Sequence, residues 1–193
     1  MSESDIAELC RKIYKEHRQA IDLIYEHRPD MRSDMADYIE QLIQQSAQSE
    51  NLDKDSAHRQ WIRFAPKEWD ELAFQKTCNK WSASRRILLF EFWNEAQSLR
   101  LHLVMGPGDV EVKQAIYQTL NKLNIKGRKK YKIKDSSWHQ ACVVQVLDSS
   151  DYEDGDLEDL QEKIKTFWLN YVNGDLKVIR QAIFDTFEPT SEL

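Results

Sequence analysis

Two apolar stretches with a two-residue period, separated by a very short loop, constrain the fold of this chain more than any other feature. They are RILLFEFWN at 86–94 and SLRLHLVM at 98–105. Successive side chains of a strand point to opposite faces, so the pair predicts an antiparallel hairpin. One face of that hairpin is nearly pure hydrocarbon, formed by Leu88, Phe90, Phe92, Leu99, Leu101, Leu103 and Met105. The other face is mixed, which is typical of a sheet covered on one side only.

Helical periodicity dominates both ends of the chain. Apolar residues spaced three and four apart predict helices over about 5–27, 33–48, 109–123, 157–172 and 176–187. Pro29 disfavours helical geometry at the residue before it, so we expect the first two helices to form a hairpin. Further strands are predicted at 60–66, 129–135 and 139–148. The polar segment 46–59 has no apolar periodicity and is the best candidate for an internal boundary.

The order of these elements predicts an α+β fold, with an N-terminal helical hairpin followed by an antiparallel sheet with helices packed on one face. We expect the hairpin to span residues 1–50 and the α+β domain residues 58–193, packed together as one compact unit. The chain of 193 residues is 41% apolar and has six tryptophans, which is enough to build a core.

Composition excludes several classes of protein. No apolar run approaches the roughly 18–20 residues that a bilayer-spanning helix needs, and the polar, acidic start MSESDIAELC does not resemble a signal peptide. The three cysteines are far apart, which argues against a disulfide framework or a cysteine-based zinc site. We therefore expect a cytoplasmic protein with no membrane partner and no cofactor.

Charge is unevenly distributed along the chain. The net charge of −6 argues against a dedicated nucleic-acid coat protein. However, the segment 122–134 has seven basic residues and no acid, whereas 148–162 has eight acids and no base. The basic segment offers phosphate contacts at Lys126, Arg128, Lys129, Lys130 and Lys132. Its alternating lysines also fit the solvent side of an edge strand. The acidic segment is interpreted as favouring a helix N-terminus.

The stretch LVMGPGDVEVK at 103–113 contains half of a nuclease signature. Together with Asp30 after Pro29, Glu111 and Lys113 supply the letters of a PD-(D/E)XK site, which holds Mg²⁺ between carboxylates. In a helix, however, side chains at i and i+2 diverge by roughly 200°. We therefore expect the glycines to end a strand and Asp109 to cap the helix that follows.

Three segments carry a resemblance to a known family. ELCRKIYKEHRQAIDLIYEHRPDM, WIRFAP and WSASRRILLFEFWNEAQSLRLHLVMGPGD resemble the C-terminal region of bacterial proteins grouped with the PD-(D/E)XK nuclease superfamily. These proteins are mostly uncharacterised, and some are linked to phage defence. The resemblance covers most of the chain and implies an α+β accessory region that follows a nuclease core. The catalytic strand of that core has no counterpart here, so no catalytic residue is carried over.

Three functions stay open. The first is a non-catalytic accessory module that binds DNA or a protein partner, such as its nuclease portion or another subunit of a homo-oligomer. The absent catalytic constellation, the aromatic content and the charge asymmetry favour it. The second is a divergent Mg²⁺-dependent nuclease, the only alternative with a metal cofactor, using Glu91, Glu95, Asp109, Glu111 and Lys113. The third is a small phage- or defence-related regulator that acts by protein contact.

Overall fold

The computed structural model describes residues 2–26, 31–78, 81–129 and 137–187, which divide into two compact units, 1–31 and 32–193. The smaller unit holds helix α1 (Glu3–Glu26), which bends at His17. The next helix, α2 (Met31–Ser49), belongs almost entirely to the larger unit. The division therefore falls at residues 31 and 32, not in the polar segment 46–59. The packing of α1 against α2 as a hairpin stays a prediction.

The larger unit is built on a five-stranded antiparallel sheet, in which each strand pairs with the next one in sequence. Its strands are β1 (Leu52–His58), β2 (Trp61–Pro66), β3 (Leu88–Glu95), β4 (Ser98–Met105) and β5 (His139–Leu147). The predicted hairpin of β3 and β4 is confirmed, with Leu88 opposite Met105 and Glu95 opposite Ser98. The α+β class is confirmed with it.

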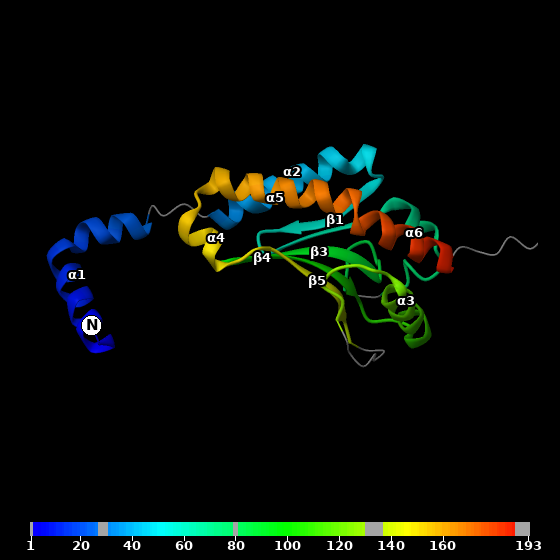
Figure 1. Cartoon of the computed structure of the whole chain (residues 1–193), viewed down its shortest axis with the longest axis horizontal. Helices are drawn as coiled ribbons and strands as arrows, with labels where there is room; N and C mark the ends of the chain where they lie inside the picture. Colours follow the sequence, from blue (N-terminus) through cyan, green and yellow to red (C-terminus); the bar gives the residue numbers. More distant parts are fainter. Residues whose placement is uncertain (1, 27–30, 79–80, 130–136, 188–193) are drawn as a thin grey trace, which may run out of the picture. The chain divides into compact units, whose positions relative to one another are not determined.

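Helices cover the hydrocarbon face of this sheet. Figure 1 shows α2 and α5 (Leu157–Asn173) over the strands, with α6 (Asp175–Phe187) continuing from α5. Helix α3 (Val110–Lys122) packs against α6, and the short helices η1 (Lys67–Glu71) and α4 (Ser149–Asp154) complete the unit.

Aromatic rings form the core between the sheet and the helices. Phe64 of β2 meets Trp168 of α5 edge to face, with ring centroids 5.4 Å apart. Phe90 of β3 contacts Tyr171 in the same way at 6.1 Å. Such pairs add about 0.5–1.5 kcal/mol beyond the area that they bury. The indole Nε1 of Trp168 also donates to Ser46 Oγ at 2.9 Å, which ties α5 to α2.

The polar segment 46–59 was predicted as a boundary, and this prediction is wrong because the segment contains strand β1. Leu52 is the only apolar residue of β1 that is buried, and a bulge between Lys54 and Ser56 interrupts the two-residue period. Its charges are not solvated linker charges: Lys54 pairs with Glu40 of α2, and Asp53 pairs with Arg86. The strand is therefore held by ion pairs that a hydrophobic pattern cannot reveal.

The strand predicted in the basic segment is barely described by the structure, whereas the predicted role of the acidic segment can be compared with it. The strand expected at 129–135 lies almost entirely outside the described residues, although Lys129 N donates to Ala141 O of β5 at 3.0 Å. In the acidic segment, Asp148 forms a capping box at the start of α4, and Asp156 caps α5. The interpretation of these acids as favouring helix N-termini is confirmed.

The loop between β4 and α3 has the structure that the turn interpretation predicted. Asp109 Oδ1 accepts from the backbone N–H groups of Glu111 at 2.7 Å and Val112 at 3.2 Å, which caps α3. The glycines are required by close approach: a Cβ on Gly106 would lie 2.4 Å from the Trp81 ring. The loop backbone therefore packs against the Trp81 ring, and the loop is not a phosphate-binding loop.

Candidate ligand site

Four tryptophans gather on the sheet face opposite the helices, which we call the tryptophan face (Trp61, Trp81, Trp93 and Trp138). They surround a pocket of about 230 Å³. Its lining residues come from β2, β3, β4 and the segments before β3 and β5: Trp61, Arg63, Trp81, Glu91, Trp93, Val104 and Trp138. The other two tryptophans, Trp69 and Trp168, are buried in the core.

Strand register brings these side chains together. Phe64 and Phe90 are paired neighbours that point into the core, so the alternation of a strand directs Arg63 and Glu91 to the opposite face. Arg63 lies opposite Glu91 in the ladder, and Trp61 lies opposite Trp93. A polar pair and an aromatic pair therefore stand side by side on one surface.

The pocket floor is an ion pair enclosed by indoles. Arg63 Nε pairs with Glu91 Oε2, and Trp93 Nε1 donates to Glu91 Oε1. Arg63 Nη1 also donates to Trp81 O at 3.1 Å, and its guanidinium lies 4.9 Å from the Trp81 ring centroid. Both Glu91 oxygens are thus engaged and two indoles are held in place, so the floor is polar but close to neutral.

A buried histidine supports the Trp93 side of the pocket. His102 is completely buried and stacks on Trp93 with ring centroids 4.7 Å apart. Neither imidazole nitrogen has a hydrogen-bond partner in the part of the chain that the structure describes. Burial, followed by the positive charges of Arg100 and Lys129, lowers the pKa of His102 to about 4. The ring is therefore neutral at physiological pH.

Acidification is expected to destabilise the protein through His102. Its folded pKa of about 4 lies below the ordinary value of 6.5, so the unfolded state binds the proton first. The resulting stability is complete above pH 6.5 and is lost as the pH falls toward 4, a change of about 3 kcal/mol. Urea unfolding over this pH range should show a shallower dependence for His102→Phe. An identical pH dependence of stability in the native chain and in His102→Phe would contradict a lowered pKa of His102.

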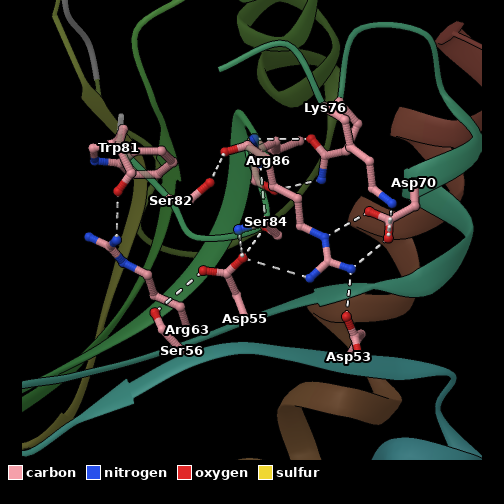
Figure 2. Close-up of polar contacts among 12 residues, drawn as sticks. Asp53, Asp55, Ser56, Arg63, Asp70, Lys76, Trp81, Ser82, Ser84 and Arg86 are labelled. Atoms are coloured by element: carbon pink, nitrogen blue, oxygen red, sulfur yellow. Dashed lines mark hydrogen bonds and ion pairs between the residues drawn. The ribbon is translucent and has the colours of Figure 1, made fainter. Parts of the chain in front are cut away.

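A second polar cluster supports Trp81 from the β1 side. Figure 2 shows Arg86 between Asp53, Asp55 and Asp70, with Trp81 beside this cluster. The Arg86 side chain is only 3% exposed, and its Nη2 lies 2.6 Å from carboxylate oxygens of both Asp53 and Asp70.

The carboxylates keep this buried arginine charged. Burial opposes the charge, but Asp70 and Asp53 outweigh it and raise the pKa of Arg86 above its ordinary value. Asp55, whose side chain is fully buried, accepts hydrogen bonds from Ser84. Arg86 Nη1 has no hydrogen-bond partner among the described residues and lies 3.9 Å from Asp55, but Nε and Nη2 are bound by Asp70 and Asp53. Because these contacts hold residues 84 and 86 against β1 and η1, we assign the cluster to positioning the segment 81–87 that carries Trp81.

The predicted basic site is only partly described. Arg128 and Lys129 lie beside β5 and the backbone N–H of Lys126 donates to Asp175 Oδ2 of α6, whereas Lys130 and Lys132 fall outside the described residues. Arg128 Nη1 donates to Asn121 O at 2.6 Å. Lys129 N donates to Ala141 O at 3.0 Å next to the bridge of Arg128 with Cys142, so this lysine lies at the β5 edge of the sheet. The chain then runs from the basic segment to Trp138 at the pocket.

The residues of the nuclease alternative fall into two groups, Glu91 and Glu95 on β3 and Asp109, Glu111 and Lys113 at the start of α3. Glu91 lies in the pocket floor on β3, and Glu95 pairs with Arg100 at the β3–β4 turn. Asp109 caps α3 and Glu111 lies exposed in its first turn. Lys113 is buried, and its Nζ donates to Ser137 O at 2.7 Å, which fixes the residue before Trp138. Across the described ranges, no group of three or more His, Cys, Asp or Glu residues suits a metal ion.

No protein-family model, curated protein or solved structure matches this chain. The resemblance to regions that follow PD-(D/E)XK nuclease cores therefore stays a prediction. In the part of the chain that the structure describes, no helix has the length and apolar character that spanning a membrane requires.

Proposed function

We propose that this chain is a non-catalytic binding module that holds a nucleic-acid strand with unpaired bases on its tryptophan face. The observation that carries the proposal is the pocket formed by four indoles around the pair of Arg63 and Glu91. The resemblance to nuclease-associated regions favours DNA as the nucleic acid. It also favours a role beside a DNA-cleaving partner, in which the module supplies binding and not chemistry.

The size and charge of the pocket suit a base. A volume of about 230 Å³ is below the roughly 300–1,000 Å³ of pockets for drug-sized ligands, so it suits a ligand group of the size of one base. A free cation is disfavoured, because the Arg63 guanidinium already lies over Trp81 and neutralises Glu91. A neutral flat ring is not repelled by the Arg63 guanidinium and does not need a free carboxylate at Glu91. Stacking of a base on an aromatic side chain is worth about 1–3 kcal/mol and tolerates every base.

Cations near the pocket suit the phosphates of such a strand. Arg100 lies 5.8 Å from the Trp93 ring centroid but already pairs with Glu95, so the exposed Lys129, held beside β5 by its backbone bond to Ala141 O, is the first candidate for a phosphate contact. The acidic segment 148–162, in contrast, lies on α4 and α5, and α5 covers the helix side of the sheet. The acids of this segment therefore do not line the pocket, so the net charge of −6 does not by itself oppose an anion there.

Lys129→Glu is expected to weaken binding of single-stranded DNA and to reduce its salt dependence. Each phosphate contact releases condensed counterions, so losing one contact should reduce the slope of log K against log salt by about 0.7–1. Fluorescence anisotropy with a labelled strand, between about 50 and 200 mM salt, measures both quantities. The matched control is Lys165→Glu on α5, where the same charge change lies on the helix side. Equal losses in both variants would indicate only a net-charge effect.

The proposal itself is tested by comparing a labelled single strand with a duplex of the same sequence. A paired base is stacked inside the duplex and cannot enter the pocket without being unpaired. We expect saturable binding of the single strand and markedly weaker binding of the duplex. Equal or tighter binding of the duplex would contradict base insertion, and no binding of either at low salt would contradict nucleic-acid binding.

A further inference from the structure

A second pocket adjoins the first one and shares two of its walls. Its volume of about 270 Å³ is close to the 230 Å³ of the first pocket. Trp61 and Trp93 line both pockets, and they lie opposite each other on β2 and β3. A ligand group in one pocket therefore lies next to a group in the other. The remaining lining residues come from the start of α2, the β1–β2 turn, the end of β3 and the turn after it: Arg32, Gln60, Asn94, Glu95 and Ala96.

One buried amide holds the walls of the second pocket together. Asn94 is completely buried, and its Nδ2 donates to Arg32 O at 2.7 Å and to Arg59 O at 2.9 Å. Its backbone N–H donates to Gln60 O at 2.8 Å. The end of β3, the β1–β2 turn and the start of α2 are thus fixed to one another. A ligand that enters this pocket does not have to order its walls first, which lowers the cost of binding.

Strand geometry sets the spacing of the two pockets. Glu91 lines the first pocket and Glu95 the second, and Trp93 lies between them in the alternation of β3. The step from one pocket to the next is thus two residues along a strand, or about 6.8 Å. Successive bases of a stacked strand are about 3.4 Å apart, so two neighbours that admit one ring between them are separated by about twice that distance. The step therefore matches two successive bases.

We propose that the second pocket holds the base next to the one in the first pocket, so that the ligand recognised is a pair of successive unpaired bases. This inference rests on the proposed function of the tryptophan face and specifies the smallest segment of strand that fills both pockets. Once the first base is bound, its neighbour reaches the second pocket without a further loss of translational freedom. Bases separated by several nucleotides lose much of this advantage, because a longer linker lowers the effective concentration.

Three labelled strands of equal length and charge test this arrangement by fluorescence anisotropy. The first has one thymine among abasic nucleotides, the second has two adjacent thymines, and the third has two thymines separated by several abasic nucleotides. We expect the adjacent pair to bind about fivefold or more tightly than the separated pair, which is the lower end of stacking on an aromatic side chain. The separated pair has the same number of bases, so it controls for the doubled chance of filling the first pocket.

The strands also distinguish failure of this inference from failure of the proposed function. Equal affinity for the adjacent and the separated pair, with both above a fully abasic strand, would overturn the second pocket and leave the first one in place. If no strand with thymines binds more tightly than the fully abasic strand, the proposed function fails and this inference fails with it.

Ala96→Leu ties the effect to the second pocket. Ala96 lies in the exposed β3–β4 turn and lines the second pocket but not the first, so a longer aliphatic side chain fills ligand space without adding a ring. We expect the preference for adjacent thymines to disappear. Gln97→Leu is the matched control, because Gln97 follows in the same turn and lines neither pocket. A preference that survives Ala96→Leu, or that Gln97→Leu also removes, would overturn the assignment.

Discussion

Arg86→Met is expected to lower the free energy of unfolding by about 3 kcal/mol, because it removes the cation shared by one buried and two partly exposed carboxylates. The Asp55 side chain is fully buried, so water cannot replace the lost charge there, whereas Asp70 and Asp53 are 21% and 45% exposed and are partly solvated. Asp70 would lose the bidentate contact of Arg86 Nε and Nη2, at 2.7 and 2.6 Å. Urea unfolding at neutral pH, with the slope checked for constancy, measures the change.

Arg100→Met is the matched control for this substitution. Its ion pair with Glu95 has the same 2.6 Å separation, but the two side chains are 30% and 51% exposed. Such an exposed pair contributes only about 0–1 kcal/mol. If Arg86→Met costs no more than Arg100→Met, the cluster does not depend on its buried arginine, and its assignment as the support of Trp81 would be wrong.

Trp61→Ala combined with Trp138→Ala is expected to reduce the affinity for single-stranded DNA by about fivefold or more. Stacking in the pocket is worth about 1–3 kcal/mol per base, and the double substitution removes two of the indoles that supply it. The two side chains are 39% and 47% exposed, so their removal leaves no cavity in the core. Anisotropy titrations with a labelled strand, beside urea unfolding of the same variant, separate binding from stability.

Leu169→Ala provides the control for lost exposed apolar area. Leu169 lies on α5, is 51% exposed and is remote in sequence from every pocket residue. The Leu169→Ala variant should bind the labelled strand with the affinity of the native chain. An unchanged affinity in the double tryptophan variant, or an equal loss of affinity in Leu169→Ala, would show that the tryptophan face does not bind the strand.

The elements with strong periodicity could be predicted from sequence because their burial is regular. The alternation in 86–94 and 98–105 predicted both the hairpin and its hydrocarbon face, and the structure confirms that Phe90 and Leu103 are paired and buried. Strand β1 could not be predicted in this way. Its lysine pairs with a glutamate on α2 and its Asp53 with Arg86, so its partners are distant in sequence and its pattern is polar.

The candidate site escaped prediction for a related reason. Its tryptophans lie at positions 61, 81, 93 and 138, and strand register and the support of Gly106 and Lys113 bring them together. The only signal in the sequence was the mixed face of the hairpin, which carries Glu91 and Trp93. The stretch LVMGPGDVEVK attracted attention for its letters. In the structure Gly106 packs closely against the Trp81 ring, and Lys113 binds the carbonyl of Ser137, the residue before Trp138.

The central claim, that the tryptophan face binds unpaired bases, is tested most directly by comparing two strands of equal length and charge. One is an oligothymidylate and the other is an abasic strand, which keeps the phosphates and sugars but has no bases. Because stacking supplies about 1–3 kcal/mol per base, we predict that the oligothymidylate binds at least about fivefold more tightly at the same salt. Equal affinity for the two strands would show that only phosphates are bound, and would contradict the assignment of the pocket.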